Sequence, residues 1–253
     1  MSGNTQRRRV LKVPPLPVRP AFRREFLDFE QGIRMGGLEP HERITQIVKA
    51  RLMEKHGKDL VIDKWGRGRF WQWICWTVRE NRDSKPLSGG MSFASAKFFI
   101  SLEREERTLD AGLQVERGRL KTGRRKPGEV YAAEDWDFYR LLAGLRKGTP
   151  LAEELDRLVR VEGFTANVGG SWEASRTFRG PKWRGVAAVR RACEVIPPEA
   201  WGWFQACYSI SEKELKEMDG AEIVATILAI FDEVTPLINL VMDKPYLAGG
   251  LKG

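Results

Sequence analysis

The residue types that carry most enzyme chemistry are sparse in this sequence. It contains two histidines, His41 and His56, which lie fifteen residues apart at the two ends of one predicted helix. They are too distant to share a metal ion, and no H-E-x-x-H or Cys/His cluster accompanies them. Three cysteines without a C-x-x-C spacing predict neither a disulfide framework nor a cysteine-rich zinc site. We therefore expect no metal, no cofactor and no histidine-based nucleophilic catalysis.

Two carboxylates offer the strongest enzymatic alternative. Asp110 and Glu116 lie six residues apart on one predicted strand, so their side chains face the same side. Carboxylates on strands can hold Mg²⁺ in nucleases, which makes a Mg²⁺-dependent nuclease one hypothesis. Arg117 and Arg119 stand where such sites usually carry a lysine, and a solvent-exposed strand face explains the same pattern. Gly66-Arg67-Gly68 lacks the later glycines and the following helix of a phosphate-binding loop.

Positive charge is the most informative feature of the composition. The chain of 253 residues carries 43 Lys and Arg against 34 Asp and Glu, a net charge of +9 that attracts polyanions such as nucleic acid. Over residues 64–73 cations alternate with aromatic rings, a pairing that grips single-stranded nucleic acid. The alternative interpretation puts Trp71, Trp73 and Trp76 in the core. The candidate phosphate-binding residues are Arg67 and Arg69 here, Arg117, Arg119, Lys121, Arg124, Arg125 and Lys126 in a predicted basic loop, and Arg176, Arg179, Lys182 and Arg184 in a second basic stretch.

Residues 1–20 are basic and punctuated by prolines, and no acidic residue occurs before Glu25. We expect a flexible tail of extended conformation, in which Arg7, Arg8 and Arg9 form an auxiliary phosphate-binding arm. The arginines resemble a twin-arginine export signal, but prolines interrupt the apolar stretch that should follow. The sequence contains no run of about eighteen apolar residues, so we expect no membrane-spanning segment. Together with the cysteine usage, these features predict a cytoplasmic protein.

The elements that position these residues follow from hydrophobic period and from helix and turn signals. The sequence predicts helices over 21–35, from Pro40 to a stop at Gly57, from 134, from Pro150, from Pro198 and over 223–242. It predicts strands over 60–62, 97–102, 108–116 and 172–178, with 97–116 as a hairpin, and it leaves 70–78 open between strand and helix. Ser211-x-x-Glu214 and Asp219-x-x-Glu222 are capping boxes, and residues 163–193 are otherwise irregular.

These elements predict an α+β fold. Its central, mainly antiparallel sheet would comprise residues about 60–118 and 172–178, packed by N-terminal and C-terminal helices. After the tail, residues 21–253 would form a single domain with a helical C-terminal part over 197–243. Between Glu173 and Glu194 the charged residues are all basic, whereas acidic residues outnumber basic ones over 212–243. This uneven distribution predicts one basic and one acidic face.

Three features, taken in order, resemble a known family. They are the polar stretch Arg79 to Pro86, the segment Phe98 to Leu102 followed by Ala111-Gly112-Leu113, and Ser211 to Leu215 leading to Phe231 to Leu237. They are similar to motifs of an uncharacterised bacterial family, domain of unknown function twenty-four sixty-one. The resemblance covers about residues 70–243 and implies an α+β fold. It assigns no activity, and the chain departs from the pattern in its shorter polar stretch and its basic N-terminus.

The leading hypothesis is a non-catalytic binding protein whose basic face engages nucleic acid, or an assembly that contains it, through phosphates and with weak sequence preference. Two alternatives stay open. One is a protein-interaction subunit that docks a partner through its acidic C-terminal helices, and the other is the nuclease with Asp110 and Glu116. The leading hypothesis requires the basic loops to converge when the chain folds.

Overall fold

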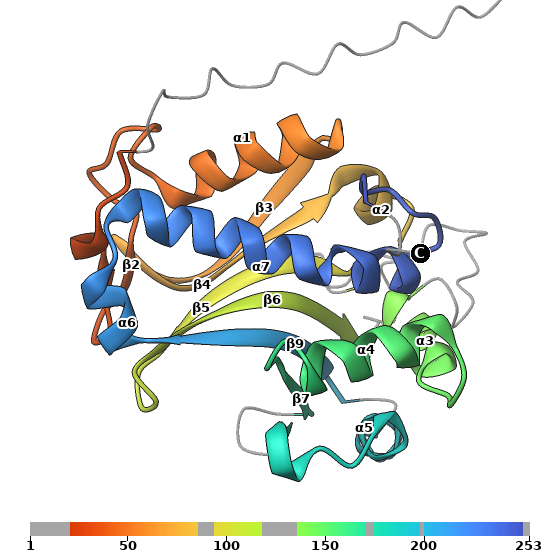
Figure 1. Ribbon diagram of the computed structural model, residues 1–253. Helices are drawn as coiled ribbons and strands as arrows, with labels where there is room; N and C mark the ends of the chain where they lie inside the picture. Colours follow the sequence, from red (N-terminus) through yellow and green to blue (C-terminus); the bar gives the residue numbers. More distant parts are fainter. Residues whose placement is uncertain (1–20, 86–93, 118–135, 171–174, 198–199, 250–253) are drawn as a thin grey trace, which may run out of the picture.

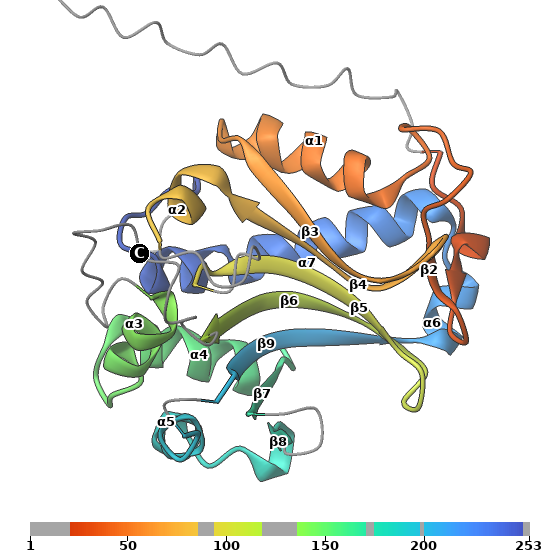
Figure 2. The ribbon, with the colours of Figure 1, turned by 180° about the vertical axis from the view of Figure 1, so that it is seen from behind.

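The fold is built on one large antiparallel sheet, shown in Figures 1 and 2. The computed structural model describes residues 21–85, 94–117, 136–170, 175–197 and 200–249. The strands are β1 (Leu27–Asp28), β2 (Gly32–Arg34), β3 (Leu60–Arg67), β4 (Phe70–Val78), β5 (Lys97–Glu103), β6 (Thr108–Arg117), β7 (Thr165–Gly169), β8 (Ser175–Phe178) and β9 (Gly202–Ser211). Their order in the nine-stranded sheet is β1-β2-β4-β5-β6-β9-β7-β8, and β3 pairs with β4. The predicted α+β class is confirmed.

Helices cover one face of this sheet. Figure 1 shows α1 and α7 lying across the strands, and Figure 2, from behind, shows the strands in front of both helices. The helical segments are η1 (Arg24–Phe26), α1 (Ile44–His56), α2 (Arg79–Asp83), α3 (Asp137–Gly144), α4 (Pro150–Arg160), η3 (Gly180–Lys182), α5 (Val186–Glu194), α6 (Glu212–Glu217) and α7 (Gly220–Val241). The shorter helices α3, α4 and α5 pack beside α7 or over β7, so they complete the same layer.

The alternation of side chains along β5 and β6 separates the two faces. Phe98 pairs with Leu113 on the helix side, where the Phe98 ring stacks on Phe231 of α7 with centroids 4.7 Å apart. Their neighbours Lys97 and Gln114 point to the opposite face. The core therefore lies between the sheet and α7.

The long helix α7 is the central core element. By length and composition alone, this helix could also cross a membrane. Half of its apolar stretch of 18 residues is buried within the fold, as expected for a core helix.

Local signals in the sequence gave several elements correctly. The β5–β6 hairpin forms as predicted, and α1 ends where Gly57 adopts φ of +63°. The helix predicted from Pro40 begins at Ile44 instead. Both capping boxes form, with Ser211 before α6 and Asp219 before α7.

The predicted helix over 21–35 is wrong. Only one turn of 3₁₀ helix forms, and the chain then folds into β1 and β2. Gly32 has φ of +116°, and a Cβ atom there would lie 2.9 Å from the carbonyl oxygen of Trp71. The close approach of β2 to β4 overrides the helical spacing of the phenylalanines, because pairing with β4 satisfies the backbone polar groups that this edge would otherwise expose.

The predicted helix from Pro198 is also wrong, because Gly202–Ser211 forms β9 between β6 and β7. The helical part therefore starts at Glu212 rather than at residue 197. The ambiguous segment 70–78 is strand β4, and the irregular stretch 163–193 contains β7 and α5. The segments 70–78 and 202–211 carry apolar side chains on both faces, so hydrophobic period did not separate strand from helix there.

Candidate nucleic-acid interface

Four cations surround one open depression where β8, η3 and α5 meet. Arg176, Lys182, Arg184 and Arg191, here called the basic cluster, line a hollow of about 500 Å³. All four side chains are exposed. Arg179, the remaining residue predicted in this stretch, is exposed beside them, between β8 and η3.

The chain between β8 and α5 is held by a buried tryptophan. Trp183 packs into the core, and its indole Nε1 donates a hydrogen bond to Oδ1 of Asp156 on α4 at 2.7 Å. Lys182 and Arg184 flank this anchor and remain in solvent. Gly185, with φ of +78°, then turns the chain into α5. The anchor thus fixes the backbone that carries two of the four cations.

The charge of the basic cluster is not neutralised within the described ranges. None of its four residues takes part in an ion pair there, whereas the adjacent Arg190 is paired with Glu194 at 2.7 Å. The first turn of α5 carries no acidic residue, and no side chain caps it. The free N–H groups of that turn therefore add to the positive potential.

The acidic C-terminal segment neutralises other parts of the molecule. Its carboxylates pair with cations on α1, α4 and the β5–β6 turn, and with Lys85 after α2. The pairs are Asp232 with Lys55 at 2.5 Å, Glu233 with Arg157 at 3.0 Å, Glu212 with Arg107 at 2.9 Å and Asp243 with Lys85 at 3.2 Å. These carboxylates thus neutralise cations elsewhere on the molecule and not those of the basic cluster.

A second cationic group lies on the β3–β4 hairpin. Arg67 and Arg69 are exposed there beside Trp65, whose side chain is 56% exposed. This hairpin lies toward the β1–β2 end of the strand order, whereas the basic cluster follows β8 at the other end. The predicted residues therefore form at least two separate groups. Of the three tryptophans that the core interpretation named, Trp76 is buried and its indole donates to the carbonyl oxygen of Thr45 at 3.0 Å, whereas Trp71 and Trp73 are only partly buried.

Arg117 does not reach solvent. It is 6% exposed, and its Nη2 donates to the carbonyl oxygens of Ile196, Pro197 and Ala200 at 3.3, 2.5 and 3.3 Å. Its guanidinium ties the end of β6 to the segment before β9, so the expected phosphate contact is corrected to a structural role. The other predicted loop residues, Arg119, Lys121, Arg124, Arg125 and Lys126, and the arm Arg7 to Arg9 lie outside the described residues.

Asp110 and Glu116 share one face of β6, as predicted, but they have different partners. Glu116 is ion-paired with Lys97, and Asp110 accepts a hydrogen bond from Thr108 at 3.0 Å. Burial raises the pKa of Asp110, which disfavours the charged form that a metal ion would need. Across the described ranges, no three Asp, Glu, His or Cys side chains gather as a metal site would require. The nuclease hypothesis gains no support from this arrangement.

A buried polar cluster joins α2, the start of β5, α3 and the chain after α7. The ammonium of Lys85 lies 3.4 Å from Asp137 and 3.2 Å from Asp243. The second oxygen of Asp137 accepts from Asn81 at 2.8 Å and from the backbone N–H of Ala96 at 2.7 Å. Each contact joins elements far apart in sequence, so this cluster is part of the scaffold.

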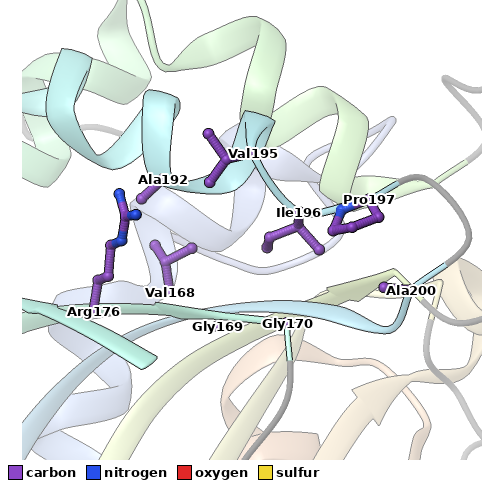
Figure 3. Close-up of a pocket in the computed structure, with 9 residues that line it drawn as sticks. All are labelled: Val168, Gly169, Gly170, Arg176, Ala192, Val195, Ile196, Pro197 and Ala200. Carbon is purple, nitrogen blue, oxygen red and sulfur yellow. The ribbon is translucent and has the colours of Figure 1, made fainter. Parts of the chain in front are cut away.

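Sequence reasoning missed two parts of the site. Arg191 belongs to the acid-free run of bases, but its contribution depends on α5, which was not predicted. The second is an aliphatic cavity of about 290 Å³ between β7 and α5, shown in Figure 3. Val168 and Gly170 lie on its β7 side, and Ala192 and Ile196 lie on its α5 side. No local sequence signal marks a space between two elements.

Comparisons of this chain with protein-family models, with curated proteins and with solved structures each gave no match.

Proposed function

We propose that this protein is a non-catalytic nucleic-acid-binding protein that engages phosphates with the basic cluster. The observation that carries the proposal is the set of four exposed cations around one depression, none of which is ion-paired within the part of the chain that the structure describes. Three of the four are arginines, whose planar guanidinium can donate two parallel hydrogen bonds to one phosphate. A free nucleic acid or one held in a larger assembly presents the same phosphates.

The proposed contacts are of the kind that position a strand without reading its sequence. Arg176, Arg184 and Arg191 would bind phosphate oxygens directly, and Lys182 would act as a point charge. The uncapped first turn of α5 adds N–H dipoles of the same sign. We therefore expect weak sequence preference and an affinity that falls steeply with salt.

Charge reversal tests the proposal. The variant Arg184→Glu/Arg191→Glu should weaken binding of a fluorescently labelled oligonucleotide by about tenfold or more, measured by anisotropy at low salt. The matched control is Lys213→Glu/Lys244→Glu, which makes the same change in net charge at two exposed lysines that have no ion-pair partner within the described residues. Thermal melting establishes that both variants fold.

The two variants separate a local interface from a general effect of charge. We expect the control to retain nearly all of its affinity. Equal losses in both variants, or full affinity in Arg184→Glu/Arg191→Glu, would remove the basic cluster from the interface.

A further inference from the structure

We infer that the basic cluster binds a single strand and that the aliphatic cavity beside Arg176 receives one unstacked base of that strand. The inference rests on the proposed function and adds the form of nucleic acid that this site selects.

One face of α5 connects the two hollows. Ala188, Arg191 and Ala192 follow the spacing i, i+3, i+4 and therefore share one side of the helix, and Val195, the C-cap residue in αR conformation, continues the spacing at i+7. The first two line the basic depression, and the last two line the aliphatic cavity. A ligand that lies along this face passes from charged to apolar surroundings.

Arg176 stands at the junction. It is the residue common to the lining of both hollows. Figure 3 shows its side chain rising from β8 toward α5 beside Ala192, at one end of the cavity. On β8, Arg176 pairs with Val168 of β7, which places both side chains on the face that α5 covers. A phosphate held by Arg176 would therefore place its own nucleotide at the cavity entrance.

The cavity suits the flat, weakly polar faces of a base. Its volume of about 290 Å³ is close to the lower end of the range of about 300–1,000 Å³ found for small-molecule sites. Val168 lies on one side, and Ala192 and Ile196 lie on the other, as Figure 3 shows. A base in a duplex is stacked and paired, and bringing it here would first require it to leave the helix. A single strand presents unstacked bases without that cost.

The four cations favour a nucleotide strand over an aliphatic anion. A fatty acid could place its chain in the same cavity, but its single carboxylate would leave most of the basic cluster without a partner. A strand carries one phosphate per nucleotide, so neighbouring phosphates can occupy several of these cations at once.

Two substitutions narrow the cavity from opposite sides. Ala192→Leu adds bulk from α5, where the native side chain is buried. Gly170→Ala adds a methyl group on the β7 side. This group narrows the cavity, because a Cβ atom at Gly170 would lie 3.2 Å from Cγ2 of Ile196. The matched control is Ala187→Leu, which makes the same change at an exposed position of α5 that lines neither hollow.

The experiment compares three labelled ligands of equal length by anisotropy: a single strand of DNA, the same strand with abasic residues throughout, and the duplex. We expect the native protein to bind the single strand about tenfold more tightly than the abasic strand, the effect of one base–protein contact. Ala192→Leu and Gly170→Ala should reduce the affinity for the single strand to that for the abasic strand. Their affinity for the abasic strand should equal that of the native protein, and Ala187→Leu should bind both strands as the native protein does. A strand containing 2-aminopurine gives an independent fluorescence signal of base insertion.

The outcomes separate the inference from the proposal beneath it. Equal binding of normal and abasic strands, with the dependence on Arg184 and Arg191 retained, would overturn base insertion and leave phosphate binding in place. An oligonucleotide affinity that is unchanged in Arg184→Glu/Arg191→Glu would overturn both base insertion and phosphate binding by the basic cluster. Binding of decanoate that Ala192→Leu abolishes, with no 2-aminopurine signal and no difference between normal and abasic strands, would assign the cavity to an aliphatic anion instead.

Discussion

Lys97 and Glu116 form an ion pair across β5 and β6 in which both side chains are almost removed from water, 2% and 3% exposed. The pair lies on the sheet face opposite α7, and the Lys97 ammonium is 5.9 Å from the centroid of the Trp73 ring. A buried carboxylate depends on its partner, because an uncompensated charge in this position carries a large desolvation cost.

Removing one member of this pair should destabilise the protein strongly. We expect Lys97→Met to lower the free energy of unfolding by about 3–5 kcal/mol, since Glu116 would remain buried and unpaired. The double variant Lys97→Met/Glu116→Leu should recover most of that loss, because it removes both charges. Urea denaturation of the two variants provides the measurement. A single variant as stable as the double one would contradict the assigned coupling.

Arg117 should affect stability and not nucleic-acid binding. Arg117→Met removes the guanidinium donor shared by the carbonyl oxygens of Ile196, Pro197 and Ala200, and we expect a loss of about 1–3 kcal/mol in unfolding free energy. Oligonucleotide affinity, measured where the variant is fully folded, should equal that of the native protein. A large loss of affinity with unchanged melting temperature would instead identify a phosphate contact.

The salt dependence should report the number of phosphate contacts. Four contacts to a single strand predict a slope of about −3 in log K against log salt concentration. Arg191→Ala should reduce the magnitude of this slope by about one unit. Arg190→Ala is a matched control on the same helix, because Arg190 is already paired with Glu194. Equal slopes for native protein and Arg191→Ala would argue against a direct contact.

The cationic hairpin tests whether the interface extends across the sheet. Arg67→Glu/Arg69→Glu changes the net charge by the same amount as the reversal of Arg184 and Arg191. Because the hairpin and the basic cluster lie toward opposite ends of the strand order, we expect a smaller loss of affinity, well under tenfold for a short oligonucleotide. An equal loss in the anisotropy assay would instead indicate one continuous interface.

His56 should make the protein less stable in weak acid. Its ring is buried and stacks on Phe98, with centroids 6.2 Å apart. Burial lowers the pKa of His56 below the ordinary value of 6.5, Lys55 lowers it further, and Asp232 opposes this shift. The unfolded chain therefore binds the proton more readily than the folded protein, and stability falls as the pH drops through about 6.5. His56→Gln should flatten the plot of unfolding free energy against pH between about pH 7 and pH 5. An unchanged slope in this variant would assign the pH dependence to other groups.

Local signals in the sequence were sufficient for much of the fold. The two strands predicted over 97–102 and 108–116 indicated the β5–β6 hairpin, the capping boxes predicted the starts of α6 and α7, and Gly57 predicted the end of α1. These features succeed because a turn, a cap or a two-residue period involves neighbours along the chain. The excess of positive charge between residues 173 and 194 was likewise visible without any coordinates.

Tertiary packing decided which charges remain available. Arg117 and Arg184 are the same residue type in basic surroundings, yet one donates to buried carbonyl groups and the other faces solvent. Packing also made residues 202–211 the interior strand β9, although their apolar side chains suggested a helix. Burial, pairing and charge neutralisation depend on residues distant in the chain but close in space, so only the folded structure brings Arg176 and Arg191 together beside a cavity.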